Sequence, residues 1–72
     1  MTPAIFAVRL KERRLALSLT QEALGKLSGV SGLTISHYEV GRRQPDLDHL
    51  KALADALECS TDYLLGRDET GN

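Results

Sequence analysis

At 72 residues the chain can hold one domain around one small hydrophobic core, which leaves little room for the pocket of an enzyme. Hydrophobic residues make up 42% of the chain and charged residues 26%, which is too apolar for a disordered protein, and no apolar run approaches the roughly 20 residues that span a membrane. The net charge of −1 divides into +4 over residues 1–43 and −5 over residues 44–72, so either the first part faces an anionic partner or both parts are simply solvated.

A first helix is expected over residues 3–17. Thr2 is typical of a helix N-cap and Pro3 of a first helical turn. Three apolar residues then recur at helical spacing: Phe6, Leu10 and Leu17. Ser18 and Leu19 form the break that follows.

A second, short helix is expected to begin after Thr20, which is a favourable N-cap. Leu24 and Leu27 are expected to face the core. Gly29 ends this helix, because glycine adopts a positive φ without steric penalty. Val30, in the turn, is expected to pack inward.

A third helix is expected to begin at Ser31 and to end at Gly41. Ile35 and Tyr38 share one face of it, and we expect that face to be buried. A basic loop follows over residues 42–45.

Two more helices complete the pattern. Asp46 caps the fourth, whose apolar stripe is Leu47, Leu50, Leu53, Ala54 and Leu57. We expect the leucines of this stripe to lie in the core; the alternative is a dimer surface. Ser60 or Thr61 caps the fifth, Gly66 ends it, and its apolar part is Tyr63, Leu64 and Leu65. Five helices with short connections predict an all-α bundle over residues 1–66, with a polar tail over 67–72.

Residues 20–43 have the pattern of a helix-turn-helix: a capped helix, a glycine turn and a second capped helix. In this arrangement the second helix enters the DNA major groove, while the first crosses the phosphate backbone. Thr20 and Gln21 stand at a helix N-terminus, whose free N–H groups favour phosphate. Arg42 and Arg43 follow the second helix, where they are expected to meet the backbone.

The outward positions of the third helix are Gly32, Leu33, Thr34, Ser36 and His37. Leu33 can contact a thymine methyl, and the side chains of Thr34 and His37 can hydrogen-bond to base edges. Ser31 and Ser36 are expected to contact phosphate. The alternatives are a helical hairpin inside an ordinary bundle, with His37 a solvated histidine and Gln21 a plain capping-region residue.

Several short motifs stand in order along the chain: L-T-Q at 19–21, G-V-S at 29–31, T-I-S at 34–36, Y-E at 38–39, a glycine at 41 before basic residues and Pro45, and D-Y-L-L-G at 62–66. Together, over about residues 5–66, they resemble the Cro/cI-type (XRE, lambda-repressor-like) helix-turn-helix family. The resemblance implies a lambda-repressor-like five-helix bundle with the motif formed by helices 2 and 3. It also implies a transcriptional regulator, a repressor, that binds double-stranded DNA.

The resemblance implies roles at matching positions as well. Gln21 stands at the family's phosphate-contacting glutamine, and Arg42 and Arg43 in its backbone-contacting loop. The base-reading positions are Gly32, Leu33 and His37. Arg14 and Glu39 stand where many members form an ion pair that joins helix 1 to the recognition helix. Gly32 has no side chain and Leu33 cannot hydrogen-bond to a base, so the sequence preference departs from the family pattern.

The expected partner is a partly palindromic operator bound by a homodimer, because one such module buries little DNA surface and two half-sites lie about one helical turn (~34 Å) apart. No cofactor is expected, and Cys59 with two separated histidines makes no metal site. A single cysteine and the lack of a signal-peptide pattern favour the cytoplasm, with no membrane partner.

Two other classes of function remain open. A protein-interaction module, antitoxin-like or an adaptor, would use helices 4 and 5 and is motivated by the acidic second half of the chain. An enzyme is not expected, since no carboxylate pair, nucleophile with a base, or phosphate-cradling glycine loop is visible.

Overall fold

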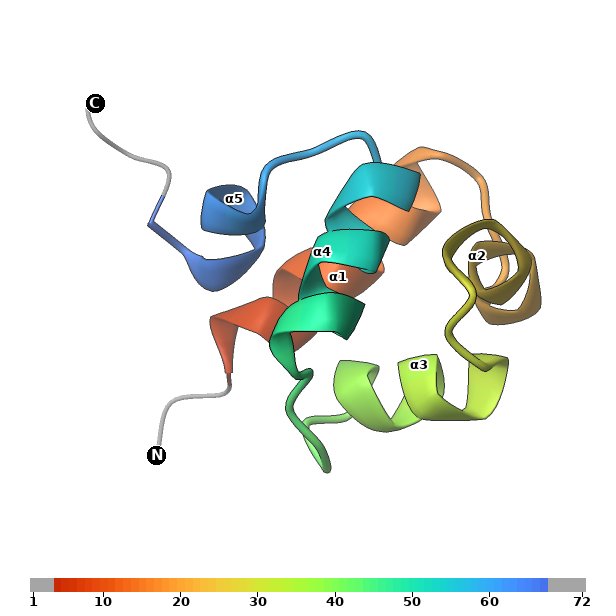
Figure 1. The fold of residues 1–72 in the computed structure, drawn as a ribbon, viewed down its shortest axis with the longest axis horizontal. Coiled ribbons are helices and arrows are strands. Elements are labelled where there is room, and N and C mark those ends of the chain that lie inside the picture. The colour runs from red at the N-terminus through yellow and green to blue at the C-terminus, as the bar shows by residue number, and fades with distance from the viewer. Residues whose placement is uncertain (1–3, 68–72) are drawn as a thin grey trace.

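A computed structural model describes residues 4–67 of the chain. In this range the protein forms five α-helices and no strand: α1 (Ile5–Ala16), α2 (Gln21–Ser28), α3 (Gly32–Glu39), α4 (Leu47–Ala56) and α5 (Thr61–Leu65). Figure 1 shows α1 and α4 in the middle of the molecule, α2 and α5 at its two ends and α3 along the lower edge. The expected all-α bundle of five helices is confirmed.

Four of the five helices begin at the capping residues expected from the sequence. The side chains of these N-caps accept a hydrogen bond from the backbone N–H three residues later: Thr20, Ser31, Asp46 and Ser60. Each such bond satisfies one of the N–H groups that a helix start leaves unpaired. Local chemistry therefore sets these four boundaries.

The first helix differs from its expected start. Ala4 has an extended conformation (φ −62°, ψ 123°) and gives no side-chain cap, so α1 begins at Ile5 and the start at Pro3 is wrong. Thr2 and Pro3 themselves lie outside the described residues, as does the expected tail after Arg67. None of the described helices has the length and apolar character needed to cross a bilayer.

The core lies where the helices meet, and it is mostly aliphatic. Its buried residues come from every helix and from the turn after α2: Phe6, Leu10, Leu24, Val30, Ile35, Tyr38, Leu50, Leu53, Ala54, Leu57 and Leu64. Burial of these side chains is the main favourable term in the folding of such a domain. The inward packing expected for Val30, Ile35 and Tyr38 is confirmed.

Two leucines expected in the core are exposed, and that expectation is wrong. Leu27 is 62% exposed, and Leu24 is the one residue of α2 that is fully buried. Leu47 is 82% exposed, at the start of α4, where it borders a groove between α4 and α5 instead of filling the core. The spacing of apolar residues identifies the apolar face of a helix. It does not show how much of that face the neighbouring helices cover.

Candidate nucleic-acid interface

The turn between α2 and α3 is tight, and two glycines allow it. Gly29 has a left-handed conformation (φ 80°), and its N–H donates to the carbonyl of Gly25 at 2.8 Å. A Cβ at Gly25 would lie only 2.6 Å from the carbonyl oxygen of Val30, so only glycine lets the chain pass this closely. Gly25 was not singled out from the sequence, although a glycine inside a helix is unfavourable and so indicates a packing reason.

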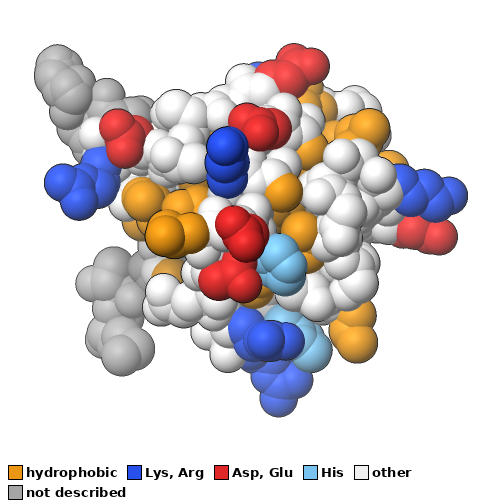
Figure 2. Space-filling model, in the orientation of Figure 1, with side chains coloured by type: hydrophobic (Ala, Val, Ile, Leu, Met, Phe, Trp, Pro, Cys, Tyr) orange, Lys and Arg blue, Asp and Glu red, His pale blue; other side chains and the backbone are white. Residues whose placement is uncertain are grey.

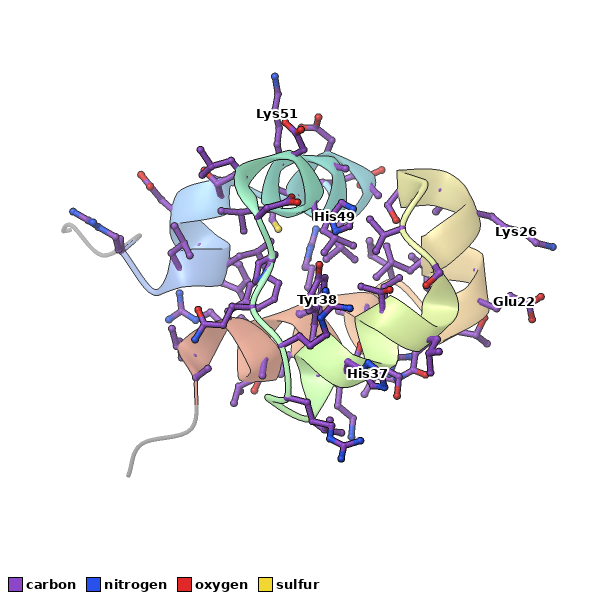
Figure 3. All side chains as sticks on the ribbon, turned by 60° about the horizontal axis from the view of Figure 1, so that its bottom comes forward. Glu22, Lys26, His37, Tyr38, His49 and Lys51 are labelled. Carbon is purple, nitrogen blue, oxygen red and sulfur yellow. The ribbon has the colours of Figure 1, made fainter. Side chains whose placement is uncertain are left out.

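The third helix is buried along one face and accessible along the other. Ile35 and Tyr38 anchor it in the core, while Leu33 is 69% exposed on the opposite side. Thr34, Ser36 and His37 are half-buried. Because α3 lies along the lower edge of the bundle in Figure 1, its outer face points away from the other helices. Figure 3 shows His37 on this side of α3.

The N-terminal end of α3 faces the first turn of α2. A Cβ added at Gly32 would lie 3.5 Å from Cα of Glu22, an ordinary contact, so position 32 points partly toward α2. The Ser31 hydroxyl accepts from the N–H of Thr34 at 3.1 Å and donates to Oγ1 of Thr34 at 2.8 Å. Oγ1 of Thr34 therefore accepts within the protein, which leaves its own hydroxyl hydrogen to donate outward.

The two residues from which we expected phosphate contacts stand at the start of α2. Oγ1 of Thr20 accepts from the N–H of Ala23 at 2.9 Å, as an N-cap does. Gln21 is half-buried, and its Nε2 donates to Oε1 of Glu39, at the end of α3, at 3.1 Å. The two ends of the helix-turn-helix are thus joined directly by side chains.

Arg14 and Glu39 form a buried, bidentate ion pair between α1 and α3. Nε of Arg14 donates to Oε2 of Glu39 at 2.7 Å and Nη2 to Oε1 at 2.9 Å, with the side chains only 9% and 3% exposed. A third guanidinium nitrogen, Nη1, donates to the carbonyl of Leu19 at 2.8 Å. The hydrogen bond to Glu39 raises the pKa of Arg14, against the opposing effect of burial. Removing either partner would leave an uncompensated buried charge.

Other basic side chains of α1 are also used inside the protein. Nη1 of Arg9 donates to the carbonyl of Tyr63 at 2.7 Å and its guanidinium stacks on the Tyr63 ring, while Nε of Arg13 donates to the carbonyl of Leu57 at 2.9 Å. The charge of +4 over residues 1–43 is therefore not all available to phosphates. Arg9 and Arg13 instead join α1 to α5 and to the C-terminal end of α4.

Arg42 and Arg43 are exposed directly after α3. Gly41 (φ 79°) turns the chain, and the N–H of Arg42 donates back to the carbonyl of His37 at 2.9 Å. Figure 2 shows Lys and Arg side chains gathered at the lower edge of the molecule, where Figure 1 places the end of α3 and this loop. The exposed positive charge thus adjoins the accessible face of α3.

One contact at this site was not expected. Oη of Tyr38 lies 2.7 Å from Nδ1 of His49, and Figure 3 shows the His49 side chain reaching from α4 toward Tyr38. From the sequence, His49 was one of two separated histidines and had no expected partner. Its partner is eleven residues away on another helix, which no local pattern reveals.

Comparisons with known proteins agree with this architecture. A family model described as helix-turn-helix matches residues 10–64. Repressor protein C2 of Salmonella phage P22 is 43% identical over 68 residues, which cover 94% of this chain and 32% of that protein. The transcriptional regulator ImmR of Bacillus subtilis is 41% identical over 61 residues, covering 85% of this chain and 48% of that protein. The chain thus spans about a third to a half of the length of these relatives.

A solved structure shares the fold and much of the sequence. The crystal structure of the P22 c2 repressor in complex with a synthetic operator superposes with a TM-score of 0.83 at 44% identity, covering 88% of this chain and 96% of that chain. The family match covers most of the chain, and the helices on either side of the Gly29 turn are those of the motif. This chain belongs to the Cro/cI-type (XRE-like) helix-turn-helix family of transcriptional regulators.

Proposed function

We propose that this protein binds double-stranded DNA sequence-specifically by placing α3 in the major groove, and that it acts as a transcriptional repressor. The observation that carries the proposal is the accessible face of α3, with Leu33 69% exposed while Ile35 and Tyr38 are fixed in the core. A helix about 10–12 Å across fits a major groove about 12 Å wide. The similarity of this chain to the P22 c2 repressor, which was solved in complex with a synthetic operator, supports DNA binding here.

Three side chains and one backbone position read bases in this proposal. Leu33 contacts a thymine methyl group, Thr34 donates its hydroxyl hydrogen, and His37 donates to or accepts from a base edge. Gly32 contributes through its backbone. An apolar residue at the most exposed position favours a site that contains thymine.

Phosphate contacts fix the register of α3 on the duplex. They come from both sides of the motif: Thr20, Gln21, Ser31, Ser36, Arg42 and Arg43. Ser31 contributes through its backbone N–H, because its hydroxyl hydrogen is donated to Thr34. The two arginines supply the part of the affinity that depends on salt, because their contacts release counterions. The hydroxyl and amide groups orient the protein without carrying sequence information.

We propose further that two copies bind a partly palindromic operator, in the cytoplasm. The groove between α4 and α5 is lined in part by apolar residues: Leu47, Leu50, Ala54 and Leu65. Leu47 is 82% and Leu65 41% exposed, and a second copy would cover both. Pairing two such modules supplies affinity and specificity that one helix in one groove lacks.

Selection of bound DNA from a random pool tests the proposal. The expected result is an enriched site with two related half-sites about one helical turn apart. Uniform retention of the pool with no enriched sequence would overturn specific regulation. Sedimentation of the complex on the selected site, and on one half-site, then gives the number of chains bound.

A second candidate is a protein-interaction module in which α4 and α5 hold a partner. The 82% exposure of Leu47 and the charge of −5 over residues 44–72 favour it. Replacing both Arg42 and Arg43 by alanine leaves such a function intact, whereas it strongly weakens DNA binding under the first proposal.

A further inference from the structure

We propose that Glu39 is a positioning residue for DNA binding, whose buried carboxylate fixes the side-chain amide of Gln21 so that its remaining N–H faces a backbone phosphate. This inference rests on the proposed function. It assigns a role in DNA contact to an ion pair that otherwise serves only to hold helices together.

The carboxylate of Glu39 is itself held firmly. Arg14 occupies both of its oxygens, at 2.7 and 2.9 Å, and the Glu39 side chain is only 3% exposed. Oε1 accepts a further hydrogen bond from Nε2 of Gln21 at 3.1 Å. Because three donors and burial restrain the Glu39 side chain, its carboxylate holds the Gln21 amide in a fixed position.

The chemistry of the contact fixes the orientation of the amide. An ionised carboxylate can only accept hydrogen bonds, so Gln21 must turn its nitrogen, and not its oxygen, toward Glu39. One of the two amide hydrogens is used in this bond, and the other remains to donate. Because the acceptor is charged, the bond is stronger than one between neutral groups.

The position of Gln21 makes the remaining N–H useful. Gln21 is the first residue of α2, at the helix end that favours anions, and it is half-buried. A donor that is already oriented loses less side-chain entropy when a phosphate oxygen arrives. Gln44, the other glutamine of the chain, lies exposed in the loop after α3 and provides an internal comparison.

The first experiment begins with the unmodified chain. Side-chain amide spectra of the uncomplexed protein should show slower hydrogen exchange and less motion for Gln21 than for Gln44. In Glu39→Gln the Gln21 amide should become more mobile. If the two glutamines behave alike in the unmodified chain, Glu39 does not hold the amide and the inference is overturned.

The second experiment asks whether the contribution of Gln21 to DNA binding depends on Glu39. Gln21→Ala is measured on the selected DNA in the unmodified chain and in Glu39→Gln, after circular dichroism shows that each variant is folded. We expect Gln21→Ala to weaken binding roughly 10-fold in the unmodified chain, the loss of one hydrogen bond to a charged group. In Glu39→Gln the same substitution should cost no more than about 2-fold, since the amide is no longer positioned.

The outcomes separate this inference from the proposed function. Equal losses in both backgrounds would show that Glu39 acts only as a support for α3, and would overturn the positioning role alone. Failure of the unmodified chain to prefer any DNA sequence would overturn both proposals. Glu39→Asp keeps the charge but shortens the side chain, so Gln21→Ala should cost no more than about 2-fold in this background as well. A loss as large as in the unmodified chain would show that charge and not orientation is measured, and would overturn the positioning role.

Discussion

Oη of Tyr38 and Nδ1 of His49 lie 2.7 Å apart, and this hydrogen bond joins the last turn of α3 to the first turn of α4. Tyr38 is only 2% exposed, and the ring of Phe6 from α1 packs edge-on against it with centroids 5.7 Å apart. The ion pair between Arg14 and Glu39 holds the same end of α3. The C-terminal end of α3 is therefore fixed from two sides, whereas its outer face is left accessible.

Tyr38→Phe should lower stability without changing the fold. The substitution keeps the buried ring but removes the hydroxyl, which leaves the side chain of His49 without this partner. We expect a loss of about 0.5–1.5 kcal/mol, and a melting temperature lower by about 4–8 °C for each kcal/mol. Thermal unfolding measures the change. Tyr63→Phe is the matched control, because it keeps the ring contact with Arg9, and an equal loss there would contradict the assignment.

Alkaline pH should destabilise the protein in part through Tyr38. Burial raises the pKa of Tyr38, with Asp46 acting in the same direction and Arg43 opposing it. The unfolded chain then loses this proton at about pH 10, before the folded chain does, so unfolding becomes easier as the pH rises further. Urea unfolding between about pH 9 and 11 should show a smaller loss of stability for Tyr38→Phe than for the unmodified chain. Burial likewise raises the pKa of the Cys59 thiol, but this contribution is common to both proteins.

Local chemistry made most of the fold predictable. Thr20 and Ser31 are N-caps because their side chains reach a backbone N–H three residues away, which is a property of the sequence itself. The exposure of Leu27 and Leu47 was not predictable in this way. It depends on how far helices distant in the sequence extend over each apolar stripe.

The candidate site was predictable only in its outline. The helix-turn-helix pattern identified α2 and α3, and the pairing of Arg14 with Glu39 was implied by resemblance to the family. The hydrogen bond from Gln21 to Glu39 links residues 18 positions apart, and the inward use of Arg9 and Arg13 links α1 to distant backbone carbonyls. Such contacts arise from tertiary packing, for which a single sequence carries no periodic signal.

Gly25→Ala should destabilise the helix-turn-helix, and Gly32→Ala should not. A Cβ at Gly25 would lie 2.6 Å from the backbone oxygen of Val30, so the turn must move, at a cost of about 1–3 kcal/mol. At Gly32 the nearest atom is 3.5 Å away, and alanine favours a helix over glycine by up to about 1 kcal/mol. Chemical unfolding of both variants gives the comparison. Equal stabilities would contradict the close approach at Gly25.

Replacing Arg42 and Arg43 by alanine should change how DNA binding depends on salt. Both side chains are exposed beside the accessible face of α3, and each phosphate contact adds about 0.9 to the slope of log affinity against log salt concentration. Each single substitution should therefore reduce the magnitude of this slope by about 0.9. It should also weaken binding to every DNA sequence by about the same factor. Lys51→Ala is the control, because Lys51 is also exposed but points away from α3, on the opposite side of the molecule in Figure 3. The slope is measured from titrations of the selected site at several salt concentrations. An unchanged slope for both arginine variants, or an equal decrease for Lys51→Ala, would show that this loop does not face the DNA backbone.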